Sequence, residues 1–448
     1  MTRAPLGWLG IVRLGLVQAS LGSIVVLTTS TLNRVMAVEL ALPVALPAAL
    51  VAWHYGVQLS RPRWGHGSDM GRRRTPWIIG GMGVLALGAL LAANATALMA
   101  GSPVAGIVLA LVAYSLIGAG VGASGTSLLA LLATRVTPAR RPAAAALTWI
   151  LMIVGIVITA GVAGALLDPF SMQRLALIAS GIALIAFVVT LLGVWGVEGE
   201  AVPVPASAEP RPSFNAVLKE TLADPRARLF GVFVFVSMVA YSAQDLILEP
   251  FAGLVFGMTP GQSTQMSGVQ HGGVLLGMIL VGAAGGLVGG RGQGWMRGWT
   301  ILGCVGSAAA LILLAVAASV GPGWPISPTV FGLGVFNGVF AVAAIGSMMA
   351  LAGADADGQP AGGREGIRMG VWGAAQAIAF ALGGFLGAVG VDLGRRVFAQ
   401  DATAFLTVFA LEAALFIAAA VIATRIGGAA RPAAPAFTPV PGADHVQA

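Results

Sequence analysis

Charged residues are scarce in this chain, and their scarcity decides its class. Asp, Glu, Lys and Arg make up only 9% of the 448 residues, whereas 57% of the residues are hydrophobic. A soluble domain carries roughly 25% charged residues. The composition therefore excludes a soluble protein and indicates an integral membrane protein.

The chain also has only one cysteine and no recognisable catalytic motif. The one cysteine, Cys304, lies inside an apolar run, which excludes a disulfide framework and a cysteine-built metal site. The sequence has no paired-carboxylate loop, no aspartate-rich prenyltransferase motif, no phosphate-binding loop and no credible serine–histidine–acid set. The net charge of +7 is spread over short loops beside apolar runs, so it does not indicate nucleic-acid binding. We therefore predict a protein that is not an enzyme and whose surroundings are the lipid bilayer.

Apolar runs of about 20 residues, the length of a membrane span, occur twelve times. They lie near residues 10–31, 41–60, 76–98, 103–132, 143–166 and 173–196, and again near 229–250, 265–289, 299–320, 327–352, 370–390 and 402–424. With both termini in the cytoplasm, 20 of the 24 Lys and Arg residues fall on the cytoplasmic side. This excess follows the positive-inside rule and gives the predicted orientation.

One long polar segment divides the spans into two sets of six. It contains four prolines between residues 203 and 212, which interrupt any helix there. We predict an all-α protein with a major facilitator fold, whose halves are related by an axis along the membrane normal. Its parts are an amino-terminal six-helix bundle (1–197), a cytoplasmic linker (198–228), a carboxy-terminal six-helix bundle (229–424) and a disordered cytoplasmic tail (425–448).

The loop between the second and third runs carries a recognisable motif. Gly65 and Asp69 precede the sequence Gly71-Arg72-Arg73-Arg74. This spacing resembles the loop between helices 2 and 3 of major facilitator superfamily proteins, although that motif has a basic residue where this chain has Met70. The alternative is a solvated basic loop of another polytopic protein.

A few polar residues lie where lipid would otherwise be, and a charge inside a span is a functional candidate. Tyr241, Asp245 and Glu249 recur every fourth residue and so share one helix face. We expect Asp245 in the outer part of the membrane and Glu249 at its outer edge. The first span leaves the membrane near Arg34 and Glu39, at a similar height.

Spans 1 and 7 both face the centre of a facilitator fold. We therefore predict that Arg34 pairs with Asp245 near the outer mouth, where each charge would offset the other's desolvation. For Glu39 and Glu249, simple wetting at the interface is an equal alternative. Several acids at span centres, as in many proton-coupled transporters, are missing, which favours a hydrophobic cargo.

Two histidines lie within spans. His54 is near the middle of the second run with Gln58 one turn away, and His271 follows Gln270 early in the eighth run. A neutral imidazole in a bilayer is a hydrogen-bonded core residue, a proton relay or an axial ligand to a tetrapyrrole metal. Neither histidine has another three or four residues away, so a zinc or di-iron cluster is not supported.

Three segments together resemble one family. They are Thr31–Pro43, Ala223–Arg228 and, most specifically, Ala240–Gly253. They are similar to the bacteriochlorophyll-delivery (PucC/LhaA-like) family of the major facilitator superfamily, and the likeness runs over about residues 6–425. The resemblance implies a non-catalytic protein of the inner, intracytoplasmic photosynthetic membrane. Such a protein would bind or deliver bacteriochlorophyll for light-harvesting or reaction-centre complexes, with bacteriochlorophyll synthase and light-harvesting polypeptides as partners.

The resemblance also gives the polar residues a role. A tetrapyrrole needs an apolar slot, one axial ligand for its magnesium and hydrogen-bond donors for its carbonyls, and His271 and His54 are our candidate axial ligands. The candidates for the pigment-binding or central polar cluster are Asn33, Arg34, Glu39, His54, Gln58, Tyr241, Gln244, Asp245, Glu249, Gln270 and His271. Two alternatives stay open: a secondary transporter of a porphyrin or other lipophile, and a pigment-free scaffold for the synthase or the antenna polypeptides.

Overall fold

The computed structural model describes residues 6–61, 73–137, 140–198, 225–287, 293–352, 365–398 and 400–426, together with Trp64, Lys219 and Ala223. Every regular element in this part of the chain is a helix, and none is a strand. Eleven of these helices are long and apolar enough to cross a membrane. The protein is therefore an all-α, multi-pass membrane protein, as its composition predicts.

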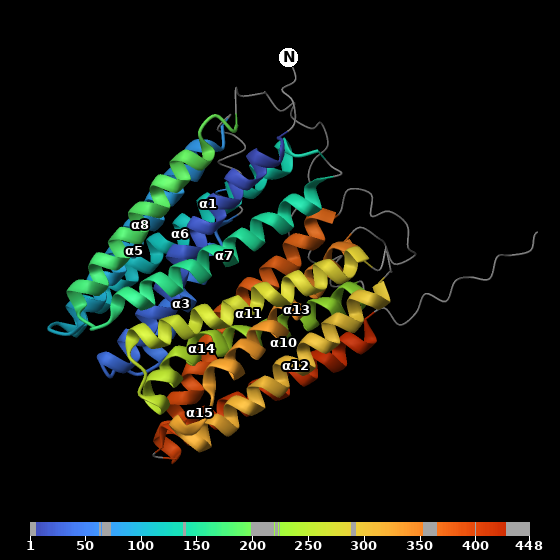
Figure 1. Cartoon of the computed structure of the whole chain (residues 1–448). Coiled ribbons are helices and arrows are strands. Elements are labelled where there is room, and N and C mark those ends of the chain that lie inside the picture. Colours follow the sequence, from blue (N-terminus) through green and yellow to red (C-terminus); the bar gives the residue numbers. More distant parts are fainter. Residues whose placement is uncertain are drawn as a thin grey trace, which may run out of the picture.

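Twelve principal helices follow one another in the predicted order (Figure 1). The first set is α1 (Trp8–Val26), α3 (Ala45–Gln58), α5 (Thr75–Met99), α6 (Pro103–Arg135), α7 (Arg141–Leu167) and α8 (Met172–Val194). The second set is α10 (Pro225–Phe256), α11 (Pro260–Leu287), α12 (Gln293–Val320), α13 (Ile326–Ala352), α14 (Glu365–Phe398) and α15 (Asp401–Arg425). With 14 residues, α3 is the shortest of them. Proline occupies the first turn of α5, α6 and α7, where its missing N–H costs nothing.

The first helix extends further than the sequence predicts. Three short segments, η1 (Leu27–Thr31), α2 (Leu32–Arg34) and η2 (Val35–Glu39), continue α1 without a break. η1 and η2 are π-helical, with hydrogen bonds from residue i to residue i+5. The polar residues near 33–39 therefore lie within the first span. The predicted end at residue 31 is wrong because Asn33 and Arg34, although polar, are buried and bond to carbonyl oxygens of the second set of helices.

The two ends of the bundle differ in charge. We call the end at which the chain enters α1, and to which it returns between α3 and α5, the basic end, and the opposite end the distal end (Figure 1). Arg74, Arg135 and Arg140 lie at the basic end, whereas Arg174 and Arg395 lie at the distal end. By the positive-inside rule, the basic end is predicted to face the cytoplasm.

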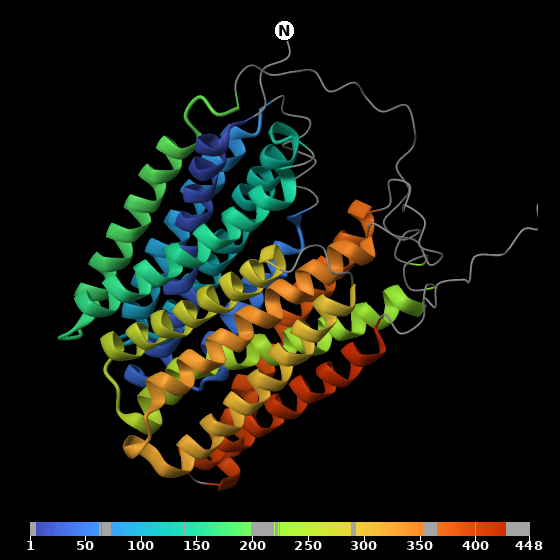
Figure 2. The ribbon, with the colours of Figure 1, turned by 45° about the vertical axis from the view of Figure 1, so that its right-hand side comes forward.

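The same helix pairings occur in both sets. α1 packs on α7 and α8, α5 on α6 and α8, and α3 on α6. In the second set α10 packs on α14 and α15, α12 on α13 and α15, and α11 on α13. Between the sets, α7 packs on α11 and α3 on α14; α7 and α11 run side by side in Figures 1 and 2. The repetition is the pattern expected of two halves related by an axis along the membrane normal.

Glycines permit the closest helix contacts. A Cβ atom on Gly120 of α6 would lie 2.5 Å from the backbone nitrogen of Leu85 in α5. A Cβ atom on Gly118 would lie 2.6 Å from the carbonyl oxygen of His54 in α3. Neither position has room for a side chain, so the packing role of small residues is confirmed at these two glycines.

Polar contacts join the two sets at the distal end. Asp392 of α14 accepts hydrogen bonds from the backbone N–H groups of Val44 (3.0 Å) and Ala45 (2.8 Å), at the start of α3. These N–H groups have no partner within the helix itself, and a carboxylate there is favoured by the helix dipole. Thr259 Oγ1 donates to Asp168 Oδ2 at 2.7 Å. The distal end is thus held closed by hydrogen bonds as well as by packing.

We predict the orientation of the ends from their charge, and cysteine labelling tests it. The native Cys304 is fully buried, so it contributes little background. In intact cells, a membrane-impermeant maleimide should label Gln400→Cys at the distal end. It should label Arg140→Cys at the basic end only after the membrane is opened. The reverse pattern would show that the basic end faces outward.

Candidate functional site

A buried serine–glutamate cluster lies where α1, α10 and α11 meet. Its members are Ser30 of η1, Glu249 of α10, and Ser263 and Ser267 of α11. Glu249 is only 2% exposed and accepts hydrogen bonds from the hydroxyls of Ser30 and Ser263. The Ser30 and Ser267 hydroxyls lie 3.4 Å apart. A carboxylate at this depth is stabilised only by such partners, so the cluster ties the two sets of helices together.

The alternative that Glu249 is simply wetted at the interface is therefore wrong. α10 continues past Pro250 to Phe256, and α11 begins at Pro260, five residues before its predicted start. The predicted span 7 ends too early, at residue 250, because Glu249 and Pro250 interrupt the apolar run there. A proline is tolerated within a membrane helix when neighbouring groups satisfy the freed backbone.

Arg34 is buried and pairs with a residue of its own helix. Its Nη1 donates to Oε1 of Glu39, and its Nη2 donates to the carbonyl oxygen of Met258 at 2.6 Å. The Glu39 side chain is 32% exposed, so it reaches the surface of the distal end. The predicted pairing of Arg34 with Asp245 is wrong. The same segment also contacts α10 itself, because Asn33 Nδ2 donates to the carbonyl oxygen of Leu246 at 2.6 Å.

A cavity of about 660 Å³ opens beside this ion pair at the distal end. Both sets of helices contribute to its wall, which includes Arg34, Glu39, Asp168, Phe170, Met258 and Thr259. Its polar groups already bond one another across the two sets. The cavity therefore lies over the closed distal end of the molecule.

Asp245 lies beside an aromatic cluster that we define as Tyr55, Tyr241 and Phe380. These rings come from α3, α10 and α14, with centroids 5.5 Å apart for Tyr55–Phe380 and 5.8 Å apart for Tyr241–Phe380. Asp245 is half-buried one turn beyond Tyr241 and interacts electrostatically with His271. The site thus combines aromatic faces, one acid and one imidazole between the two sets of helices.

The two histidines differ in the state of their ring nitrogens. His271 Nδ1 lies 2.9 Å from the carbonyl oxygen of Ser267, an acceptor only, so Nδ1 carries the proton. The lone pair of the neutral ring is then on Nε2, which has no hydrogen-bond partner among the described residues and is not completely buried, although His271 as a whole is only 9% exposed. His54 is 1% exposed; its Nε2 lies 2.7 Å from Gln58 Nε2, and its Nδ1 is buried. Of these two histidines, only His271 presents a nitrogen that a metal could reach.

The remaining candidates take other positions. Gln58 also accepts a hydrogen bond from Arg61, so it belongs to the basic end of α3. Gln270 is buried, and its backbone carbonyl packs against Gly334 of α13. Gln244 is fully buried, and neither atom of its amide has a partner within the described ranges.

The structure describes only part of the loop motif. Arg73 is exposed, and Arg74 Nη1 donates to Thr134 Oγ1 of α6 at 2.7 Å. Gly65, Asp69, Gly71 and Arg72 lie outside the described residues. No group of three or more His, Cys, Asp and Glu residues that could hold a metal ion occurs within the described part of the chain.

Sequence reasoning missed the hydroxyls of the site. Ser263, Ser267 and His271 recur every fourth residue on α11, a spacing that places them on one helix face. This spacing can be read from the sequence and indicates a polar face on α11. The positions of Asp168 and Asp392 gave none, because each contacts a residue about 90 or more positions away.

Comparison with known proteins places the chain among a defined set of relatives. The family model described as PUCC protein matches residues 31–430. The Bacteriochlorophyll synthase 44.5 kDa chain of Rhodobacter capsulatus is 54% identical over 430 residues, covering 95% of this chain and 98% of the relative. Protein PucC of the same organism is 29% identical over 439 residues, covering 93% and 92%.

A solved structure identifies the fold. The peptide transporter POT, in complex with sulfate, superposes with a TM-score of 0.68 at 15% identity, covering 95% of this chain and 97% of the transporter. At that identity the likeness concerns the fold alone. It establishes the major facilitator fold that the twelve spans and the loop motif predict.

The ion pair of the distal end can be tested by a double-mutant cycle. Arg34→Gln and Glu39→Gln should each lower the free energy of unfolding in detergent, because each leaves a buried or half-buried charge without its partner. Their effects should be coupled by about 1–3 kcal/mol, since the residues are in contact. Arg34→Gln and Asp245→Asn should instead be additive within about 0.5 kcal/mol. Coupling to Asp245 in place of Glu39 would contradict the observed pair.

Proposed function

Because this chain belongs to the PUCC protein family, we propose that it is a non-catalytic carrier or assembly factor for bacteriochlorophyll. In this role it binds the pigment and delivers it for the assembly of light-harvesting or reaction-centre complexes. The observation that carries the proposal is His271, whose protonated Nδ1 is fixed on a backbone carbonyl while Nε2 stays available. Two relatives bear names connected with bacteriochlorophyll or PucC, which supports the same class of cargo.

The geometry of His271 matches what a metal-ligating histidine requires. Such histidines donate the other ring N–H to a carbonyl or carboxylate, which fixes the tautomer and the ring orientation. Magnesium at the centre of a tetrapyrrole accepts an axial ligand of this kind, so His271 would hold the pigment by Nε2. His54 is an unsuitable ligand because its two nitrogens are bonded or buried.

The surroundings of His271 suit a large planar ring. The aromatic cluster of Tyr55, Tyr241 and Phe380 offers apolar faces against which a macrocycle can stack. Asp245 interacts electrostatically with both tyrosines of this cluster and with the imidazole, so it is near enough to contact a polar edge of the ring system. These groups belong to both sets of helices, so bound pigment would bridge the two sets.

A catalytic role is the first competing reading, because the 54%-identical relative is named as a chain of bacteriochlorophyll synthase. Glu249 at the centre of this chain accepts hydrogen bonds from the hydroxyls of Ser30 and Ser263, and Ser263 also bonds the backbone carbonyl of Pro260. That arrangement favours a role in holding the helices in position over a role in proton transfer. A purified chain that makes pigment by itself would overturn the non-catalytic proposal.

Transport is the second competing reading, and the fold favours it. Hydrogen bonds across the two sets at the distal end would have to break for a cargo to cross. We propose delivery within the membrane, from the synthase to antenna polypeptides in the intracytoplasmic photosynthetic membrane, because the cargo is lipophilic. A pigment flux that depends on an ion gradient would favour transport instead.

Absorption spectroscopy tests the proposed axial ligand. The full chain, purified gently from a bacteriochlorophyll-making host, should carry pigment with a band shifted from that of free pigment. His271→Ala should lower the pigment-to-protein ratio by at least about tenfold, since changes even in the groups around a metal ligand cost that much. Added imidazole should restore part of the band, because it supplies the missing nitrogen.

The matched control is His54→Ala, which removes the same group from a sealed position and should retain pigment. Equal pigment in the wild type and His271→Ala would end the ligand assignment. A colourless wild type that co-purifies with the synthase or an antenna polypeptide would favour the pigment-free scaffold.

A further inference from the structure

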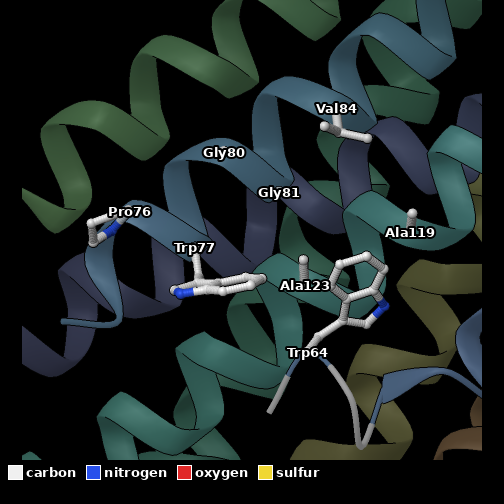
Figure 3. A pocket seen from close by; sticks show the side chains of 8 residues that line it. All are labelled: Trp64, Pro76, Trp77, Gly80, Gly81, Val84, Ala119 and Ala123. Atoms are coloured by element: carbon white, nitrogen blue, oxygen red, sulfur yellow. The ribbon is translucent and has the colours of Figure 1, made fainter. Parts of the chain in front are cut away.

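An apolar slot that the proposed function does not use lies at the basic end of the first set of helices. Its volume is about 370 Å³, and α5 and α6 form its walls (Figure 3). Its lining residues are Trp64, Pro76, Trp77, Gly80, Gly81, Val84, Ala119 and Ala123. None of these side chains carries a charge, so the slot can accept only an apolar group.

The small residues explain why the slot exists. Gly81 faces α6, where a Cβ atom would lie 2.5 Å from the backbone nitrogen of Ser124, so the two helices are in direct contact there. Gly80, one residue earlier, is exposed, and a Cβ atom on it would meet nothing within 4 Å. Ala119 and Ala123 provide the facing wall on α6. The space is thus open to the outside and bounded by a rigid helix contact.

Two indole rings border the slot. The centroids of Trp64 and Trp77 lie 6.2 Å apart, and Figure 3 shows the ring of Trp77 pointing toward the ring of Trp64. Trp64 Nε1 donates to Ser60 Oγ at 2.9 Å, so its polar edge is turned toward the end of α3. Tryptophan has this orientation at membrane interfaces, with its apolar body toward lipid and its N–H toward the polar side.

Two arginines, Arg61 and Arg73, lie near the slot. The Cγ atom of Arg61 and the ring of Trp64 both lie against Gly122 of α6, so Arg61 stands next to the slot. Arg73 is exposed three residues before the lining residue Pro76. The backbone N–H groups of Arg74 and Thr75, at the start of α5, already bond Glu198. Arg61 Nη2 donates to Gln58, so an anion at the mouth would be held by the remaining N–H groups of Arg61 and by Arg73, and not by the helix N-terminus.

We propose that this slot binds one acyl chain of an anionic phospholipid, whose phosphate is held by Arg61 and Arg73. An apolar groove beneath a group of arginines at the predicted cytoplasmic surface has the complementary chemistry for both parts of such a lipid. The interfacial tryptophans place the groove at the level where phosphate and acyl chain join. The proposal does not depend on pigment binding.

Native mass spectrometry of the full chain in detergent tests the site, with dioleoylphosphatidylglycerol and dioleoylphosphatidylcholine as probes. The wild type should retain one phosphatidylglycerol at concentrations at which phosphatidylcholine is lost. Gly80→Leu fills the slot without entering the helix contact and should lower this retention at least about tenfold, since the acyl chain loses its groove. Gly181→Leu is the matched control, because a Cβ atom on Gly181 of α8 would also meet nothing within 4 Å.

The headgroup contact is tested separately. Arg61→Gln and Arg73→Gln should each reduce the preference for phosphatidylglycerol over phosphatidylcholine by about fivefold, the effect of one basic residue at a membrane surface. Thermal unfolding of each variant shows that it remains folded. Equal retention of the two lipids by the wild type, or unchanged retention by Gly80→Leu, would overturn the proposal.

Discussion

The contact on which this architecture depends is the bonding of Glu249 to hydroxyls from both sets of helices. A carboxylate this deeply buried is unfavourable unless its oxygens are satisfied, and Ser30 and Ser263 satisfy them. Because Ser30 belongs to the first set and Ser263 to the second, separating the sets would leave the acid without one of its donors. The π-helical turns of η1 and η2 widen the first helix where it meets α10.

The width of those turns accounts for the wrong prediction of the partner of Arg34. In a regular α-helix, residues five apart point about 140° away from each other, so Glu39 is not a natural partner. In a π-helical turn the bonding runs from residue i to i+5, and the backbone N–H of Leu40 indeed bonds to the carbonyl of Val35 at 3.1 Å. Arg34 and Glu39 are then brought to one face. Hydropathy and helical spacing describe regular helices, so a departure from regularity was beyond their reach.

The helices and the fold, which the sequence predicts correctly, are determined by the requirements of the membrane. A span must be apolar over its whole length and must satisfy its own backbone, so length and composition sufficed to place the twelve helices and the fold. Individual partners follow other rules. Asp392 bonds the start of α3 across 347 positions of sequence, and no local pattern indicates such a contact. His54 and His271 were equal candidates in the sequence, and only the neighbours of their ring nitrogens separate them.

The two sets of helices share their packing but not their chemistry. Equivalent helix pairs recur, yet the polar groups of the centre come mostly from α10 and α11, while the slot beside Trp64 and Trp77 belongs to α5 and α6. Packing of small and apolar residues is what the fold requires, and it is therefore repeated. Buried polar groups are costly, so they persist only where they join helices or contact something else. Gln244, whose amide lacks a protein partner among the described residues, is by this reasoning one position at which a bound group or an internal water would complete the hydrogen bonding.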